Sequence, residues 1–125
     1  MTSLNHIEEI RALLDDDSVA IGTAVTFADA AISELSAEAG YDFIWIDIEH
    51  APFDLNTVLQ HVVACRGTGS APFVRVPAGD PIIIKPILEL HPAAIIAPQV
   101  QSIADVEEVV AACKYPPVGI RGFGP

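Results

Sequence analysis

The chain has 125 residues, of which 51% are hydrophobic and only 18% charged, so it is long and apolar enough for one domain with a substantial core. Its formal net charge of −11 repels the phosphates of nucleic acids and of anionic lipid surfaces, and we expect neither as a partner. No apolar run approaches the roughly 18 residues of a membrane span, the N-terminal segment lacks the apolar core of a signal peptide, and we expect a cytoplasmic protein.

Short apolar segments alternate along the chain with longer segments of helical periodicity. A first helix is expected from Asn5, because the apolar residues around and after it recur at helical spacing. Four strand-helix units follow. Strands are predicted at 19–25, 42–48, 71–77 and 93–98. The helices between and after them are predicted at 29–40, ending at Gly40, and then from the capping residues Asp54, Asp80 and Ser102.

Strands that are apolar on both faces and are joined by helices predict a parallel sheet covered by helices. Two architectures remain open at this point. A small doubly wound sheet is complete at this length, whereas a (β/α)8 barrel usually needs about 250 residues, so the chain would supply half of one. The segment "IGTAVTFAD" contains a single glycine, and a dinucleotide site of the glycine-rich type is therefore poorly supported.

Polar side chains follow the predicted strands at their carboxyl ends. Because these ends meet at one rim of a parallel sheet, we expect the side chains to converge there: Asp47, Glu49 and His50 after the second strand, Arg75 near the end of the third, Gln99 and Gln101 after the fourth, and Arg121 in the final segment. Arg75 suits the carboxylate of a small anionic substrate, and His50 can transfer protons near neutral pH. Asp47 is expected to orient His50 or to bond a metal-bound water.

Each of these residues also has a structural interpretation. His50 can be an ordinary loop histidine, and Asp47 and Glu49 can cap the turn that follows the strand. Arg75 is harder to explain without a partner or ligand, because it is a charge in an apolar strand.

Several other polar and aromatic residues are expected to be structural. His6 and His61 are expected at solvated helix positions, and Lys85 on a helix surface. Trp45 and Tyr115 are expected to pack, and Cys65 and Cys113 to be small buried thiols that do not form a metal-ligand pair.

Three segments together resemble the HpcH/HpaI aldolase family of the phosphoenolpyruvate/pyruvate superfamily: "GYDFIWIDIEHAPFDLNTV", "FVRVPAGDPIIIKPILEL" and "APQVQSIADVEEVVAACKYPPVGIRGFGP". The resemblance implies a TIM barrel, of which residues 1–125 would be the N-terminal half: an N-terminal helix and about four βα units. It further implies a class II pyruvate aldolase that cleaves a 4-hydroxy-2-oxo acid to pyruvate and an aldehyde, and that forms a homo-oligomer.

By the same resemblance, His50 matches the catalytic base, Asp47 its partner, and Arg75 the arginine that contacts bound pyruvate. Gln99 lies in a matching segment and is predicted to bind the small 2-oxo acid substrate. The family enzymes use a divalent metal ion such as Mg, Mn or Co. Its Glu and Asp ligands come from fifth and sixth strands, which the four predicted units do not include, so no metal ligand is predicted in this chain.

The chain departs from the family pattern around the third predicted unit. His91-Pro92 replaces the usual Gly-Ala, and a residue before proline is biased away from left-handed backbone, so we expect that helix to end differently. Pro86 lies within the same helix. Two alternatives to a catalytic role stay open: a non-catalytic half-barrel that assembles with itself or a partner, and a small doubly wound binding domain.

Overall fold

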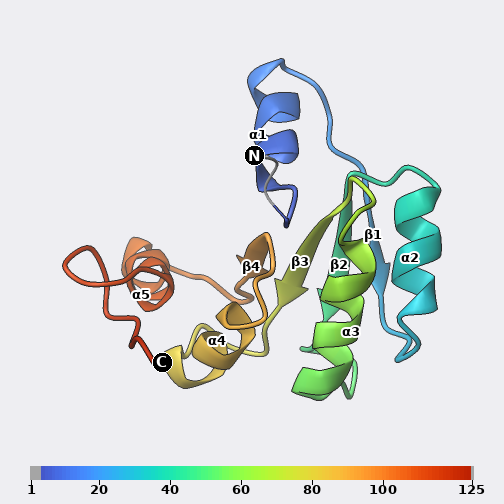
Figure 1. Ribbon diagram of the computed structural model, residues 1–125. Helices are drawn as coiled ribbons and strands as arrows, with labels where there is room; N and C mark the ends of the chain where they lie inside the picture. The colour runs from blue at the N-terminus through green and yellow to red at the C-terminus, as the bar shows by residue number, and fades with distance from the viewer. Residues whose placement is uncertain (1–3, 125) are drawn as a thin grey trace.

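The computed structural model describes residues 4–124 and consists of a four-stranded sheet with five helices (Figure 1). In chain order the elements are α1 (Ile7–Asp15), β1 (Gly22–Val25), α2 (Ala31–Glu38), β2 (Phe43–Asp47), α3 (Leu55–Cys65), β3 (Ala71–Arg75), α4 (Pro81–Leu88), β4 (Ala94–Ile96) and α5 (Ile103–Cys113). None of the helices within residues 4–124 is long and apolar enough to cross a membrane.

The sheet is parallel throughout, and its strands are neighbours in the order β1-β2-β3-β4. This order has no reversal, whereas a doubly wound sheet has one at its switch point. The prediction of a barrel segment is therefore confirmed, and the doubly wound alternative is wrong.

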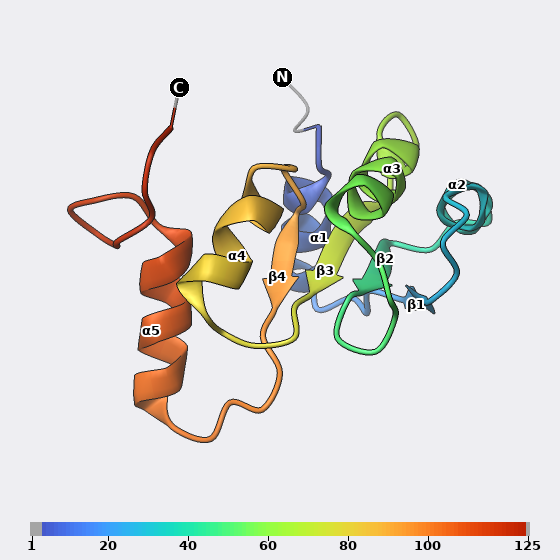
Figure 2. The same cartoon turned by 90° about the horizontal axis from the view of Figure 1, so that it is seen from below.

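Helices α2, α3 and α4 lie on one face of the curved sheet, and α5 lies beside α4 (Figure 2). The buried residues of the strands alternate accordingly. Ile44, Ile46, Val74 and Val76 face the helices and are fully buried in the core that they form with residues of α3 and α4. The odd-numbered residues of β2 and β3 line the opposite face of the sheet. There the rings of Phe43 and Phe73 stack with their centroids 4.9 Å apart.

The helix starts follow the predicted caps in three of the four strand-helix units. Asp54 accepts a hydrogen bond from Thr57 N at 2.7 Å, Asp80 accepts one from Ile82 N at 2.7 Å, and Ser102 begins a full capping box. After α2, Gly40 has a φ of 95°, the left-handed stop expected there.

The start of the first helix differs from the prediction. The residue at the N-cap is His6, with a left-handed φ of 57°, while Asn5 Oδ1 accepts a 3.4 Å hydrogen bond from Ile7 N. The strand predicted at 19–25 is also shorter, because Val19 and Ile21 are exposed and precede the paired segment.

The prediction that His6 and His61 are solvated is wrong. His61 is fully buried between α2 and α3, with its Nδ1 2.8 Å from Ser33 Oγ and its ring stacked on Phe53. The side chain of His6 is mostly buried and contacts Glu9. Helical periodicity identified the position of His61 as helical but could not show that α2 covers it, and His6 is the left-handed N-cap residue that precedes α1.

The expectation for His91 is also wrong. Its φ is 59°, in the left-handed region that proline after it disfavours. Its N–H bonds the carbonyl of Leu88 at 3.1 Å, so the end of α4 holds the residue in this conformation. Pro86 lies inside α4 as expected.

Candidate active site

Asp47 and Arg75 are the last residues of β2 and β3, and they are register partners in the parallel sheet. Their side chains therefore meet at the carboxyl end of the sheet. Arg75 Nε donates to Asp47 Oδ1 at 3.1 Å, and Nη2 donates to Oδ2 at 2.5 Å. This is a two-point pairing of the kind that fixes a guanidinium in both position and orientation.

Glu49 extends the pair into a cluster of four residues, Asp47, Glu49, His50 and Arg75, which we name the rim cluster. Arg75 Nη1 lies 3.1 Å from Glu49 Oε2, and the same oxygen lies 3.7 Å from His50 Nε2. Glu49 thus links the arginine to the imidazole, a role that the sequence did not specify.

Asp47 also shapes the turn after β2. Its Oδ1 accepts hydrogen bonds from the backbone N–H of Glu49 at 3.0 Å and of His50 at 3.2 Å. The carboxylate therefore positions His50 through the backbone of the turn. The ring itself is largely exposed, with 69% of its side chain accessible, so it can reach a molecule bound above the rim.

The charges of the rim cluster stabilise one another. Arg75 holds the pKa of Asp47 below its usual range, and the N–H groups of His50 and Glu49 add to this effect, while burial opposes it. With Arg75 positive and both carboxylates negative, the three side chains carry a net charge of −1. Of the five N–H groups of the guanidinium, three are used in these contacts, and two remain for a ligand.

Trp45 forms one wall of this cluster, because it lies on the same face of β2 as Asp47. The guanidinium carbon of Arg75 is 5.1 Å from the centroid of its ring, a cation–π contact. The packing role predicted for Trp45 is therefore confirmed. The period-two spacing of Trp45 and Asp47 along the strand is the sequence signal that places both on one face.

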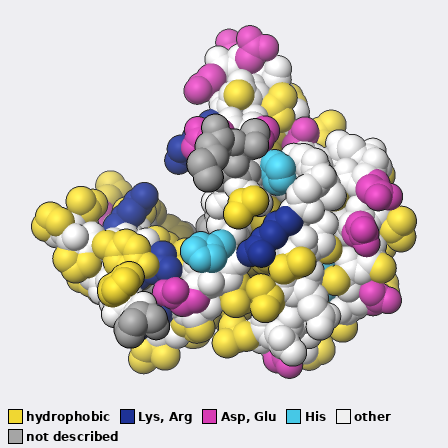
Figure 3. Space-filling view, in the orientation of Figure 1, with side chains coloured by type: hydrophobic (Ala, Val, Ile, Leu, Met, Phe, Trp, Pro, Cys, Tyr) yellow, Lys and Arg dark blue, Asp and Glu magenta, His cyan; other side chains and the backbone are white. Residues whose placement is uncertain are grey.

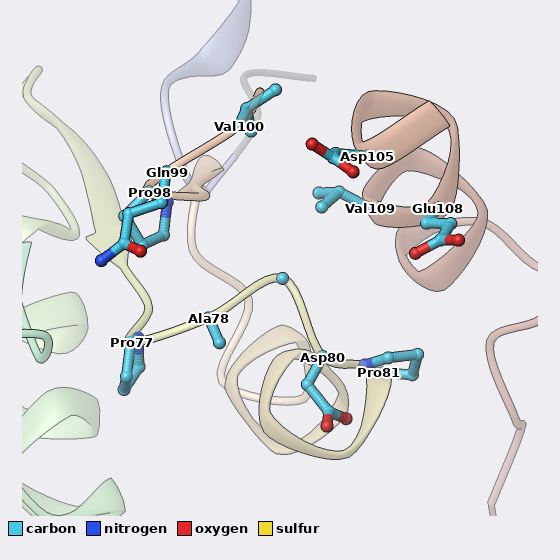
Figure 4. Close-up of a pocket in the computed structure, with 11 residues that line it drawn as sticks. Pro77, Ala78, Asp80, Pro81, Pro98, Gln99, Val100, Asp105, Glu108 and Val109 are labelled. Carbon is cyan, nitrogen blue, oxygen red and sulfur yellow. The ribbon is translucent and has the colours of Figure 1, made fainter. Parts of the chain in front are cut away.

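A cleft of about 440 Å³ lies at the carboxyl ends of β3 and β4, between the β3–α4 and β4–α5 loops (Figure 4). Gln99, with a left-handed φ of 56°, lies on one side, and Asp105 and Glu108 lie across from it on α5. Asp47, His50 and Arg75 do not line this cleft. Gln99 is thus at the same end of the sheet as the rim cluster but in a separate hollow, and its substrate contact stays a prediction.

Arg121 does not join the rim, contrary to the expected convergence. Its Nη2 donates to Glu89 Oε1 at 2.9 Å, and its guanidinium carbon is 4.7 Å from the ring of Tyr115. The backbone explains this placement: after α5 the chain turns back, and Ile120 N bonds the carbonyl of Ala111 at 2.8 Å.

The residues of the rim do not form a metal site by themselves. Within residues 4–124, no group of three or more His, Cys, Asp or Glu side chains is placed to hold a metal ion. Both carboxylates of the rim cluster are already bonded to Arg75. The described residues therefore do not fit the divalent ion that the resemblance implies.

Two curated proteins of similar sequence carry the names of aldolases. The chain is 39% identical over 91% of its length to the "Hydroxypyruvate/pyruvate aldolase" of Roseovarius nubinhibens, and covers 44% of that protein. It is 37% identical over 91% of its length to the "5-keto-4-deoxy-D-glucarate aldolase" of Escherichia coli, again covering 44%. The chain thus spans less than half the length of these relatives.

Solved structures agree with this comparison. The chain superimposes on an HpcH/HpaI aldolase/citrate lyase family protein from Burkholderia cenocepacia with a TM-score of 0.85 and 30% identity, covering 93% of this chain and 48% of the other. It superimposes on an HpcH/HpaI aldolase from Desulfitobacterium hafniense with a TM-score of 0.83 and 29% identity, covering 93% of this chain and 45% of the other. The fold is that of a TIM-barrel-type α/β protein, of which the chain covers about half.

The family model for HpcH/HpaI aldolase/citrate lyase matches residues 21–123, which include all four strands and every residue of the rim cluster. The chain belongs to the HpcH/HpaI aldolase/citrate lyase family.

Proposed function

We propose that this chain is the N-terminal half of a TIM-barrel carbon–carbon lyase that cleaves a 4-hydroxy-2-oxo acid to pyruvate and an aldehyde. The observation that carries the proposal is the rim cluster itself: a fixed arginine, two carboxylates and an exposed imidazole at the carboxyl ends of β2 and β3. In barrel enzymes this is the end at which active sites lie.

The side chains fit the steps of a retro-aldol reaction. A base takes the proton of the 4-hydroxyl, the C3–C4 bond breaks, and the aldehyde leaves from a pyruvate enolate that is then protonated at C3. His50 is exposed enough to exchange the proton, directly or through water. Arg75 directs its two unused N–H groups to the carboxylate and the developing enolate oxygen. In this proposal Gln99 contacts the part of the substrate that extends into the adjoining cleft.

The charge of the cluster supports the metal requirement that is part of this proposal. The net charge of −1 on Asp47, Glu49 and Arg75 together repels a 2-oxo acid, and a divalent ion such as Mg, Mn or Co beside them would reverse that sign. Because residues 4–124 offer no such site, we propose that its ligands, and the homo-oligomer contacts, come from outside the described residues.

A chimeric enzyme tests the proposal. Residues 21–123 would replace the matching segment of the Roseovarius nubinhibens relative, and pyruvate release from a 4-hydroxy-2-oxo acid would be followed with lactate dehydrogenase. We expect release that EDTA abolishes and added metal restores. Arg75→Lys should lower kcat/KM by about 10²-fold or more, and His50→Gln by about 10²- to 10⁴-fold.

The matched control is Arg66→Lys, because Arg66 is an exposed arginine at the end of α3, away from the rim. It should leave kcat/KM unchanged. A chimera that keeps the size and circular dichroism of its parent but releases no pyruvate contradicts the lyase proposal. Release that persists in EDTA contradicts the metal requirement alone.

A second candidate function rests on the open edges of the sheet. β1 and β4 are edge strands, and apolar side chains stay exposed beside both: Ile21, Phe27 and Leu35 next to β1 and α2, and Ile103, Val106 and Val110 on α5. Edges of this kind favour pairing with another chain. The candidate is a half-barrel that assembles with a second copy of itself.

A further inference from the structure

A buried polar pair joins α2 and α3 close to the turn that carries His50. His61 of α3 and Ser33 of α2 are both fully buried, and His61 Nδ1 lies 2.8 Å from Ser33 Oγ. The pair belongs neither to the rim cluster nor to the apolar core. A satisfied polar contact of this kind fixes two elements against each other, at the cost of removing both groups from water.

His61 also supports the segment between β2 and α3, residues 48–54, which we name the His50 segment. The ring of Phe53 stacks on the imidazole, with centroids 5.3 Å apart and an interplanar angle of 23°. Phe53 N donates to the carbonyl of Ala51 at 2.9 Å, so the stacked residue is tied to the residue that follows His50. Asp47 thus holds the start of this segment, and His61 holds its end.

The site of His61 accommodates a neutral ring better than a charged one. Its Nε2 is buried and makes no hydrogen bond among the residues that the structure describes. A neutral imidazole has a donor at one nitrogen only, whereas a protonated imidazole has donors at both. Protonation would add a positive charge and an unpaired N–H in a closed space, and both are costly there. Burial accordingly lowers the pKa of His61 below its usual 6.5.

The groups around the imidazole include one charge. Within residues 4–124, Asp29, in the loop between β1 and α2, is the charged group whose field acts on the ring, and it favours the protonated form. α2 contributes the hydroxyl of Ser33, and the His50 segment contributes the uncharged ring of Phe53. On α3 itself, Cys65 follows one turn later, and burial raises the pKa of its thiol to about 12, so it stays neutral.

The surface next to this site is acidic. Residues 26–42 contain no Lys or Arg, and Asp and Glu side chains lie over α2 in the space-filling view (Figure 3). An imidazolium that turns out of the α2–α3 interface on this side therefore meets both water and negative charge.

We propose that His61 is a positioning residue: its neutral ring holds the His50 segment against α3, and protonation of the ring releases that segment. On protonation the ring turns towards Asp29 and water, and the stack on Phe53 and the bond to Ser33 are lost. The inference deepens the proposed function, because the segment carries the proposed base, but the release does not depend on the chemistry at the rim.

An NMR titration of the ¹³C,¹⁵N-labelled 125-residue chain from pH 8 to pH 5 tests this. The parent is the His50→Gln variant, since the titration of His50 would shift the neighbouring amides. We expect the amides of Ala51 and Phe53 to move with the same midpoint as the His61 ring, at a pH below 6.5. The NOE between the rings of Phe53 and His61 should be lost below this midpoint. The amides of Ile103–Cys113 should not move, which separates release from global unfolding.

Two further variants are made in the same parent. Ser33→Ala with His61→Phe replaces the polar pair by an apolar one and keeps a ring against Phe53, so the two amides should stay at their high-pH positions down to pH 5. If this double variant does not fold, the titration of the parent decides by itself. The matched control is His91→Gln, at an exposed histidine, which should leave the titration of the amides unchanged.

Three results overturn the proposal: amides that do not move while His61 titrates, amides that titrate equally in the folded double variant, and a His61 ring that stays neutral down to pH 5. Each of them would leave the lyase proposal in place, because none of these signals requires turnover. A chimera that releases no pyruvate would contradict the lyase proposal and leave the release of the His50 segment standing.

Discussion

At the scale of single residues, Asp47 has two partners at once, the guanidinium of Arg75 and the backbone of the turn that carries His50. Asp47→Asn should therefore lower the free energy of unfolding at pH 7 by about 2 kcal/mol, since it removes a charge from a largely buried pair. Urea unfolding followed by the fluorescence of Trp45, the single tryptophan, measures this.

The pH dependence of this difference gives a second check. The pKa of Asp47 is lowered in the folded state, so its contribution is present above its ordinary pKa of 3.8 and is lost as the pH falls through the lower value. The difference between wild type and Asp47→Asn should thus shrink in acid. The control is Glu8→Gln, at an exposed pair with Arg11, which should leave the free energy of unfolding unchanged both at pH 7 and in acid. If Glu8→Gln destabilises the protein as much as Asp47→Asn does, the interpretation is wrong.

The pKa of His61 is also shifted, but the largest cause is burial and not, as it is for Asp47, a charged partner. Burial lowers the pKa of His61 below its usual 6.5, although the carbonyl of Phe27 and the carboxylate of Asp29 oppose this. As the pH falls through 6.5, His61 is therefore protonated in the unfolded chain but not in the folded chain. The free energy of unfolding decreases as the pH drops below 6.5. His61→Gln should remove up to about 1.4 kcal/mol per pH unit of this slope.

Urea unfolding from pH 8 to pH 5 measures the slope, and His50→Gln, at an exposed histidine, is the control. An identical slope in wild type and His61→Gln would show that His61 takes up its proton equally in both states.

At the scale of elements, the sequence predicted the order and type of every helix and strand, because periodicity and capping residues are local signals. The capping box of α5 is an example, since Ser102 and Asp105 stand three residues apart and bond as expected. The left-handed φ of His91 and the burial of His61 were missed, because both depend on contacts with other elements.

Ser102→Ala tests the capping box. It should lower the free energy of unfolding by about 1 kcal/mol and speed amide exchange in the first turn of α5, because Asp105 N loses its acceptor. Ser36→Ala is the matched control: Ser36 lies inside α2, where its hydroxyl donates to the carbonyl of Ile32, so alanine there should be neutral. Equal losses in both variants contradict a capping role.

At the scale of the whole molecule, the site was only partly predictable. Asp47, His50 and Arg75 could be placed at one rim because parallel strands end together, and the register confirms this for Asp47 and Arg75. The bridging role of Glu49 and the departure of Arg121 from the rim follow from side-chain geometry and from the backbone of the final segment. No pattern in the sequence encodes these two features.

The open sheet makes a prediction about assembly. All four strands are parallel and lie in the order β1-β2-β3-β4. In a dimer with a two-fold axis along the barrel, β4 of each copy would pair with β1 of the other copy, and the eight strands would form a closed barrel. If the half-barrel candidate holds, sedimentation velocity should show a concentration-dependent dimer of the 125-residue chain. Leu35→Glu, at the β1 edge on α2, should shift it to monomer, because the edge would then bury a charge.

Val63→Glu is the matched control, since Val63 is an exposed apolar residue on α3, away from both edges, and should leave the dimer intact. A monomer at every concentration, or equal dissociation by both variants, contradicts pairing through these edges. That outcome would leave the lyase proposal in place, because in a complete barrel a further segment of about the same length covers the same edges.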